Sequence, residues 1–200
     1  MPMQLGLRLK GKRIAILAEN LYNELELWYP YFRFLEAGAE VVVVGSGSAK
    51  EHFGKYGIPV VVDKFASEVK ADQFDAVVIP GGYAPDHMRR YPDMVSLVRD
   101  MALQDKVVAS ICHGGWMLAS AEVIQGKTVT AFFAIKDDLV HAGAQFVDVE
   151  VAVDGNIITS RKPEDLPAFC RAIISALAGE GMALTCPVCH ETLYRDKPWD

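Results

Sequence analysis

The chain has 200 residues, of which 51% are apolar, and its net charge is −6. This length fits one domain with a sizeable core, and the acidic balance, with a pI near 5.4, argues against nucleic acid and anionic membranes as partners. No stretch is long and apolar enough to span a bilayer, and residues 1–13 lack the apolar region of a signal peptide. Four cysteines are too few for a disulfide scaffold, so we expect a reducing cytoplasm.

Residues 12–180 alternate between strand and helix patterns, between an N-terminal arm (1–11) and a C-terminal tail (181–200). Strands are expected at 13–18, 40–45, 74–82 and 107–111, short strands at 58–62 and 128–132, and a hairpin at 146–153 and 157–160. Helices are expected at 27–37, with Pro30 in the first turn, and at 93–103, 114–121, 135–141 and 163–177. Residues 45–57 are expected to be a loop, and Pro59 indicates an edge strand. The alternation predicts an α/β fold with a doubly wound, mainly parallel sheet and helices on both faces.

The stretch at residues 107–121 carries the strongest chemical signal. An apolar strand ends at Ile111, a helix pattern follows, and Cys112 lies between them. Ser110 and Gly114 are both small, as a tight strand-to-helix nucleophile elbow requires. A helix N-terminus favours the thiolate, so we expect Cys112 to be a nucleophile, and if a protonated Glu26 also donates to the thiolate, the pKa of Cys112 should lie well below the reference of about 8.5. The alternative is a buried structural cysteine.

Other reactive groups are expected beside this cysteine, because sites of open α/β sheets lie at the carboxyl ends of the strands. The backbone amides of Gly82 and His113 could form an oxyanion hole. A desolvated, protonated Glu26 could donate a hydrogen bond to the thiolate and stabilise it, or Glu26 could instead stabilise a helix N-terminus. His113 can orient Cys112 only if the elbow bends it round, and Asp86 could then hold its far nitrogen. The alternative for His113 is a surface or interface residue.

The tail contains a second motif, Cys186-Pro-Val-Cys189-His190. It resembles one knuckle of a zinc ribbon, which supplies two or three of the four ligands that tetrahedral zinc needs. A partner chain would have to complete the site. A mobile tail or a reversible disulfide remains the alternative. The same spacing occurs in haem attachment sites, which we discount because nothing in the sequence indicates export.

Several of these segments together resemble the PfpI family, in the superfamily of the Parkinsonism-associated deglycase and the class I glutamine amidotransferases. The resemblance covers residues 12–178. It rests on the segments 24–30 (Glu-Leu-Glu-Leu-Trp-Tyr-Pro), 81–86 (Gly-Gly-Tyr-Ala-Pro-Asp), 112–114 (Cys-His-Gly), 135–139 (Ile-Lys-Asp-Asp-Leu) and 149–161. The chain departs from the family pattern at Gly115-Trp116, where Gly-Pro is common.

The resemblance implies a flavodoxin-like fold, a nucleophilic Cys112, Glu26 as its protonated partner, and the amides of Gly82 and His113 as the oxyanion hole. It implies dimers, or hexamers built from dimers. In the protease-like branch a neighbouring subunit supplies the acidic triad member, whose position here is Asp86 in place of Glu. The expected activity is that of a cofactor-free glyoxalase or deglycase acting on a small dicarbonyl in the stress response. The alternatives are an intracellular cysteine peptidase or amidase acting on a peptide, and a redox-sensing chaperone.

Overall fold

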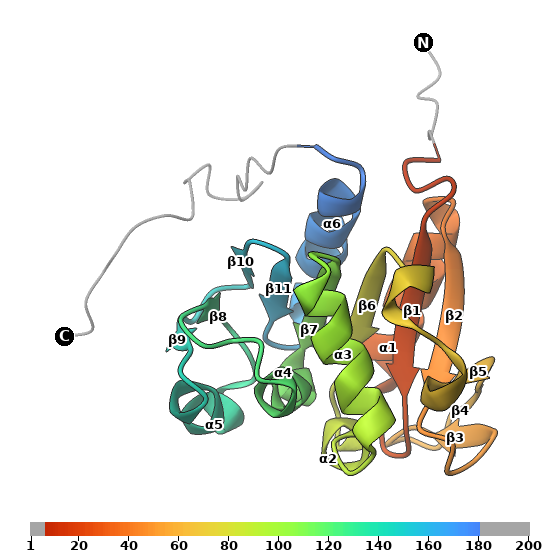
Figure 1. Ribbon diagram of the computed structural model, residues 1–200, viewed down its shortest axis with the longest axis horizontal. Helices are drawn as coiled ribbons and strands as arrows, with labels where there is room; N and C mark the ends of the chain where they lie inside the picture. The colour runs from red at the N-terminus through yellow and green to blue at the C-terminus, as the bar shows by residue number, and fades with distance from the viewer. Residues whose placement is uncertain (1–6, 181–200) are drawn as a thin grey trace.

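A seven-stranded sheet forms the centre of the protein, which a computed structural model describes over residues 7–180. Its strands, in spatial order, are β10 (Val151–Asp154), β11 (Ile157–Ser160), β7 (Val107–Ile111), β6 (Ala76–Ile79), β1 (Arg13–Ala18), β2 (Glu40–Gly45) and β5 (Lys64–Phe65). Within this sheet, only β10 and β11 pair antiparallel. The prediction of a mainly parallel sheet is therefore confirmed (Figure 1).

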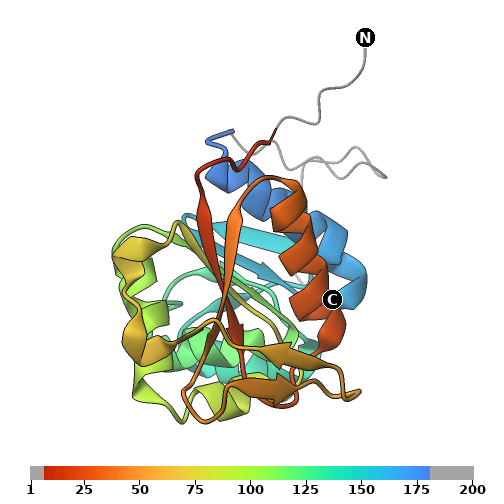
Figure 2. The same ribbon diagram turned by 90° about the vertical axis from the view of Figure 1, so that its right-hand side faces the viewer.

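Helices cover both faces of this sheet, as the doubly wound prediction requires (Figure 2). On one face α1 (Glu24–Glu36) packs against α6 (Leu166–Leu177). On the other, α3 (Pro92–Leu103) packs against α4 (Gly115–Ala121). Strands between two helical layers have no wet face, so residues 14–18 of β1 and all of β6 are buried and apolar. Each large side chain buried there contributes about 1.5–3 kcal/mol.

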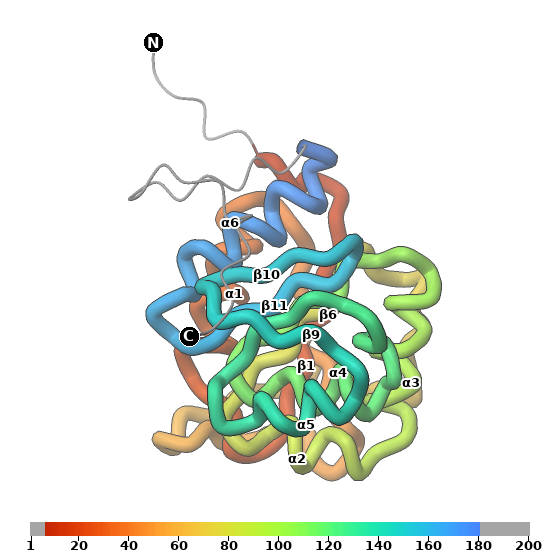
Figure 3. Tube along the Cα trace, turned by 90° about the vertical axis from the view of Figure 1, so that its left-hand side faces the viewer, coloured from red at the N-terminus to blue at the C-terminus, as the bar shows by residue number. Residues whose placement is uncertain are grey.

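Two small sheets, two short α-helices and five 3₁₀ turns complete the described chain. β3 (Glu51–Phe53) pairs antiparallel with β4 (Pro59–Val61), and β8 (Thr128–Val129) pairs parallel with β9 (Gln145–Phe146). The short helix α5 (Lys136–His141) contacts α4 and β9 (Figure 3), and α2 (Ala84–Met88) contacts α4. In this part of the chain, no helix has both the length and the apolar character needed to cross a membrane.

The first helix differs from the sequence prediction in a way that bears on the site. It begins at Glu24 rather than at residue 27, because Asn23 caps it: the Asn23 side chain accepts a hydrogen bond from the Leu25 amide at 3.1 Å. Pro30 therefore lies inside the helix, and its expected place in the first turn is wrong. Apolar periodicity missed the first turn because its buried members, Glu24 and Glu26, are charged residue types.

Two further sequence predictions need correction. Residues 45–57 are not only a loop, since they contain β3, although the edge character indicated by Pro59 is confirmed because β4 belongs to a two-stranded sheet. The expected strand at 146–153 is divided into the end of β9 and most of β10. The turn between β10 and β11 is confirmed, with Gly155 at a φ of 63°.

Candidate active site

The turn after β7 holds Cys112 in a conformation that few residues adopt. Its φ is +58°, in the left-handed region, which is unfavourable for a side chain with a Cβ atom. A 3₁₀ turn from Cys112 to Gly114 then leads into α4. A Cβ atom on Gly114 would lie 2.5 Å from the Ile79 carbonyl oxygen and 3.2 Å from the Ser110 Cβ. The tight approach expected of Ser110 and Gly114 is confirmed, and it fixes the strained elbow.

Glu26 lies beside this elbow and is fully buried. Its Oε2 atom accepts a hydrogen bond from the Gly81 amide at 2.7 Å. Burial raises the pKa of the Glu26 carboxyl to about 7, although the Gly81 amide and the contact with Cys112 act in the opposite direction. A substantial fraction of Glu26 is therefore protonated at neutral pH, and this carboxyl can hold or release a proton next to the thiol.

The thiol of Cys112 does not have the low pKa expected from the sequence. Burial and the nearby charge of Glu26 raise its pKa to about 12, against the backbone amides of Gly82 and His113, which favour the thiolate. Helix α4 starts only at Gly115, so its N-terminus does not outweigh these effects. Cys112 and Glu26 form a coupled pair, in which one negative charge is tolerated and two are not. The thiolate is favoured when the proton resides on Glu26.

Two consecutive glycines make this close packing feasible. A Cβ atom on Gly81 would lie 2.6 Å from Glu26 Oε2, 2.7 Å from the Cys112 Cβ and 2.9 Å from the His113 nitrogen. Gly82 has a φ of +74° and forms an isolated β-bridge with Tyr22. Any side chain at Gly81 would separate the acid from the thiol, so the strand-end glycine pair brings Glu26 and Cys112 together.

The elbow also bends His113 back over its neighbour. The His113 Nδ1 atom lies 3.3 Å from the Cys112 Sγ. The imidazole is half-buried among aromatic rings, with centroid distances of 6.1 Å to Tyr83, 5.0 Å to Trp116 and 5.1 Å to Phe132. Burial, and secondarily the charge of Lys55, lower the pKa of His113. A neutral imidazole in this position can accept a proton.

Asp86 is not brought together with the other candidates. It lies on α2, where its carboxylate forms an ion pair with Arg90 one turn further along. Within residues 7–180, no hydrogen bond or ion pair of Asp86 with His113 is present. The single chain therefore does not assemble a nucleophile, a base and an orienting acid, because the Asp86 carboxylate pairs with Arg90 in the turn that follows α2.

A buried polar cluster around Glu19, which follows β1, was not predicted from the sequence. The Glu19 carboxylate lies 2.9 Å from the Nδ1 atom of buried His52, and it accepts hydrogen bonds from Ser46, Ser48 and the Asn20 amide. Burial alone would raise the pKa of Glu19, but these contacts lower it to about 2. The cluster ties β3 to the ends of β1 and β2. It was missed because residues 45–57 carry no strand periodicity.

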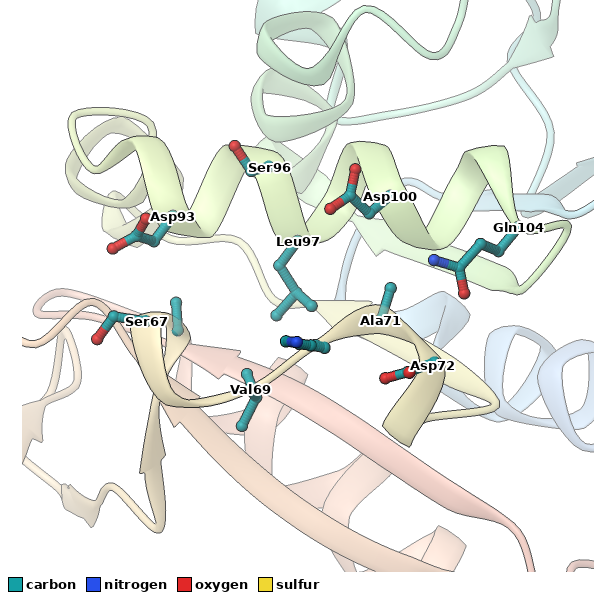
Figure 4. Close-up of a pocket in the computed structure, with 11 residues that line it drawn as sticks. Ser67, Val69, Ala71, Asp72, Asp93, Ser96, Leu97, Asp100 and Gln104 are labelled. Atoms are coloured by element: carbon teal, nitrogen blue, oxygen red, sulfur yellow. The ribbon is translucent and has the colours of Figure 1, made fainter.

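Between residues 7 and 180 no group of three or more His, Cys, Asp or Glu side chains is arranged to hold a metal ion. The tail candidates Cys186, Cys189 and His190 lie outside the described residues. A cavity of about 370 Å³ opens between α3 and the 3₁₀ turns at Ala66–Glu68 and Ala71–Gln73 (Figure 4). Its charged lining is mainly acidic and contains no cysteine or histidine, so it is separate from the Cys112 site.

Comparison with known proteins agrees with this geometry. The model of the DJ-1/PfpI family matches residues 12–176. A protein named as a deglycase from Pyrococcus abyssi is 44% identical over 165 residues, which are 82% of this chain and 99% of that protein. YraA from Bacillus subtilis, provisionally named a cysteine protease, is 39% identical over 167 residues, covering 84% of this chain and 99% of YraA.

Among solved structures, a two-domain protein of Anabaena variabilis with DJ-1/ThiJ/PfpI-like and ferritin-like domains superposes with a TM-score of 0.83 at 43% identity. The match covers 90% of this chain, which spans about half the length of that protein (52%). The sheet topology, the cysteine elbow and these matches lead to one conclusion: the chain belongs to the DJ-1/PfpI family.

Proposed function

We propose that the protein is a cofactor-free enzyme in which Cys112 attacks electrophilic carbonyls, of the glyoxalase or protein deglycase type. The observation that carries the proposal is the contact between a strained cysteine and a buried carboxyl whose pKa is raised to about 7. A relative at 44% identity is named a deglycase. Proton donation and acceptance at neutral pH is what the conversion of a dicarbonyl into a hydroxy acid needs.

In the proposed reaction Cys112 acts as the nucleophile and Glu26 as the carrier of a proton. Cys112 adds to the aldehyde carbon of methylglyoxal while the amides of Gly82 and His113 stabilise the developing oxyanion, giving a hemithioacetal. Glu26 then removes the proton from that carbon and returns one to the adjacent carbon, which leaves a lactoyl thioester. Water, activated by His113, hydrolyses the thioester to lactate and regenerates the thiol. Methylglyoxal and water give lactic acid, so no external oxidant or reductant is required.

A cysteine peptidase or amidase is the second candidate. The observation in its favour is the His113 Nδ1 atom at 3.3 Å from the Cys112 sulfur, which is the arrangement of nucleophile and general base. YraA, at 39% identity, is provisionally named a cysteine protease. This activity would require an acidic group for His113. In our proposal Asp86 of a neighbouring copy supplies it, in a homodimer or in a hexamer of dimers.

The remaining parts of the proposal concern cofactors and place of action. The proposed conversion of methylglyoxal and water into lactic acid uses only side chains, backbone amides and water, so the enzyme needs no resident metal. Zinc in the tail, held by Cys186, Cys189 and His190 with a partner chain, is a separate proposal without a part in catalysis. A reducing cytoplasm is our proposed location, because Cys112 must stay a thiol to react.

One assay separates the candidates. Purified protein and the Cys112→Ala variant are each given methylglyoxal, with lactate as readout, and a fluorogenic peptide, with fluorescence as readout. We expect lactate from the unmodified protein and none from the variant. Cysteine-dependent peptide cleavage by the oligomer, without lactate, would replace the first function by the second. Lactate from the Cys112→Ala variant would refute the first function, and peptide cleavage by that variant would refute the second.

A further inference from the structure

The imidazole of His113 has no carboxylate partner within residues 7–180 of the single chain. Its one side-chain hydrogen-bond contact in that part of the chain is with the Cys112 Sγ atom at 3.3 Å. In a catalytic triad an acidic group holds the base in the orientation that faces the nucleophile, so another restraint on the ring is needed here. The imidazole also contacts three aromatic rings, those of Tyr83, Trp116 and Phe132.

Trp116 is the ring among these three whose own orientation is fixed by a hydrogen bond. Its Nε1 atom donates to Asp138 Oδ2 on α5 at 2.8 Å. Phe132 has no polar atom in its ring, and Tyr83 is 59% exposed, with no hydrogen bond of its hydroxyl among the described residues. The indole meets the imidazole edge-to-face, with the two centroids 5.0 Å apart and an angle of 60° between the ring planes. This contact therefore joins the imidazole to a ring that is itself held.

Two neighbouring helices hold the indole in place. Asp138 belongs to α5, which packs on the start of α4: a Cβ atom on Gly115 would lie 3.2 Å from methyl carbons of Ile135 and Leu139. Arg89, the C-terminal cap of α2, places its guanidinium carbon over the indole, 5.9 Å from the ring centroid. The ring therefore cannot turn without losing a hydrogen bond to one helix or a cation–π contact with the other.

We propose that Trp116 is a positioning residue that, held by Asp138, keeps the His113 imidazole turned towards the Cys112 thiol. The indole takes the part of the orienting carboxylate of a triad, but it acts through ring contact rather than through a hydrogen bond to the imidazole. Asp138 acts one step further away, on the indole. The inference rests on the function proposed above, in which His113 activates water, and the peptidase alternative uses the same imidazole.

The size of the expected change follows from the contact that is lost. Trp116→Leu keeps an apolar side chain but removes the ring, so the imidazole gains freedom to rotate. We expect kcat for lactate to fall by about threefold to tenfold, which is the range that an aromatic contact supplies. KM should stay nearly constant, because the indole acts on the imidazole and not on the substrate. Trp116→Phe should retain more of kcat, and Asp138→Ala should give a smaller loss than Trp116→Leu.

The test is a double-mutant cycle between Trp116→Leu and His113→Ala. Its readout is the rate at which iodoacetamide alkylates Cys112 at pH 7, because this reaction needs the thiol proton to be removed but needs no turnover. Any change in access to the thiol appears in both backgrounds and cancels, so the cycle isolates the part that acts through the imidazole. We expect a coupling of about threefold to tenfold. Asp137→Ala is the matched control for Asp138→Ala, since both residues are exposed in the first turn of α5.

The outcomes separate this inference from the proposed function. Equal effects of Trp116→Leu with and without the imidazole overturn the positioning role, even if the protein makes lactate. Equal losses in Asp137→Ala and Asp138→Ala overturn the part of Asp138, and Asp138→Ala carries the cycle with His113→Ala if Trp116→Leu does not fold. A coupled effect on alkylation in a protein that makes no lactate refutes the proposed function but supports the positioning role.

Discussion

Replacing Glu26 by Gln removes a charge from beside the thiol while keeping the shape of the side chain. The Gln oxygen can still accept from the Gly81 amide, which now lies 2.7 Å from Glu26 Oε2. Two charges about 4 Å apart at an effective dielectric constant of about 20 interact by about 4 kcal/mol, or about three pKa units. The charge of Glu26 is the second cause, after burial, of the rise in the Cys112 pKa to about 12. We therefore expect Glu26→Gln to lower the thiol pKa by about one to three units.

The same variant should lose turnover, because an amide cannot transfer the proton between the two substrate carbons. The thiolate is followed by its ultraviolet absorbance against pH, with Cys112→Ala as the blank for the other cysteines, and lactate production is measured in parallel. A more acidic thiol combined with a loss of turnover of at least about a hundredfold is the expected result. An unchanged or raised thiol pKa would refute the coupling of the pair, and retained turnover would refute Glu26 as the proton carrier.

Three further predictions concern stability and the tail. Gly114→Ala should destabilise the protein by about 1–3 kcal/mol in urea unfolding, because the new methyl would lie 2.5 Å from the Ile79 carbonyl oxygen; unchanged stability would show that the elbow is not tight. Glu19→Gln should cost on the order of 2–3 kcal/mol at pH 7, and the difference should fade as the pH drops from about 4.5 towards about 2, since a carboxyl with a lowered pKa stabilises only while ionised. A pH-independent difference would contradict that account. Deleting residues 183–200 should leave the melting temperature and the lactate yield unchanged, while metal analysis of the full chain tests the tail: zinc near one per two chains supports a site shared by two copies.

The sheet could be predicted from the sequence because its strands are buried on both faces. Such strands are nearly continuous apolar runs, and the runs at 13–18, 40–45 and 107–111 coincide with β1, β2 and β7. The elbow was predictable for a different reason, namely that Ser110 and Gly114 are small at the two positions that must approach. Both signals are local in the sequence, so neither depends on knowing the tertiary structure.

The electrostatics of the site were not predictable in the same way. The sequence places Cys112 before a helix, which favours a low pKa, but the depth of burial and the separation from Glu26 are properties of the fold. These reverse the expected direction for the thiol. The attachment of the turn at residues 54–58 to the start of α1 was hidden as well, because the turn lies in a stretch without periodicity and reaches the helix through hydrogen bonds of its backbone amides. Hydrogen bonds of the backbone do not depend on which residue types form them, so they cannot be predicted from the sequence pattern.

The central claim is that Cys112 forms a covalent bond with the carbonyl substrate and that Glu26 carries the proton afterwards. The most direct measurement is mass spectrometry of the Cys112 peptide after rapid acid quenching of a reaction with methylglyoxal. The account predicts a mass increase equal to one methylglyoxal on Cys112, transient in the unmodified protein and accumulating in Glu26→Gln, where the proton transfer is blocked. Lactate formation with no adduct on Cys112 in either protein would contradict the account.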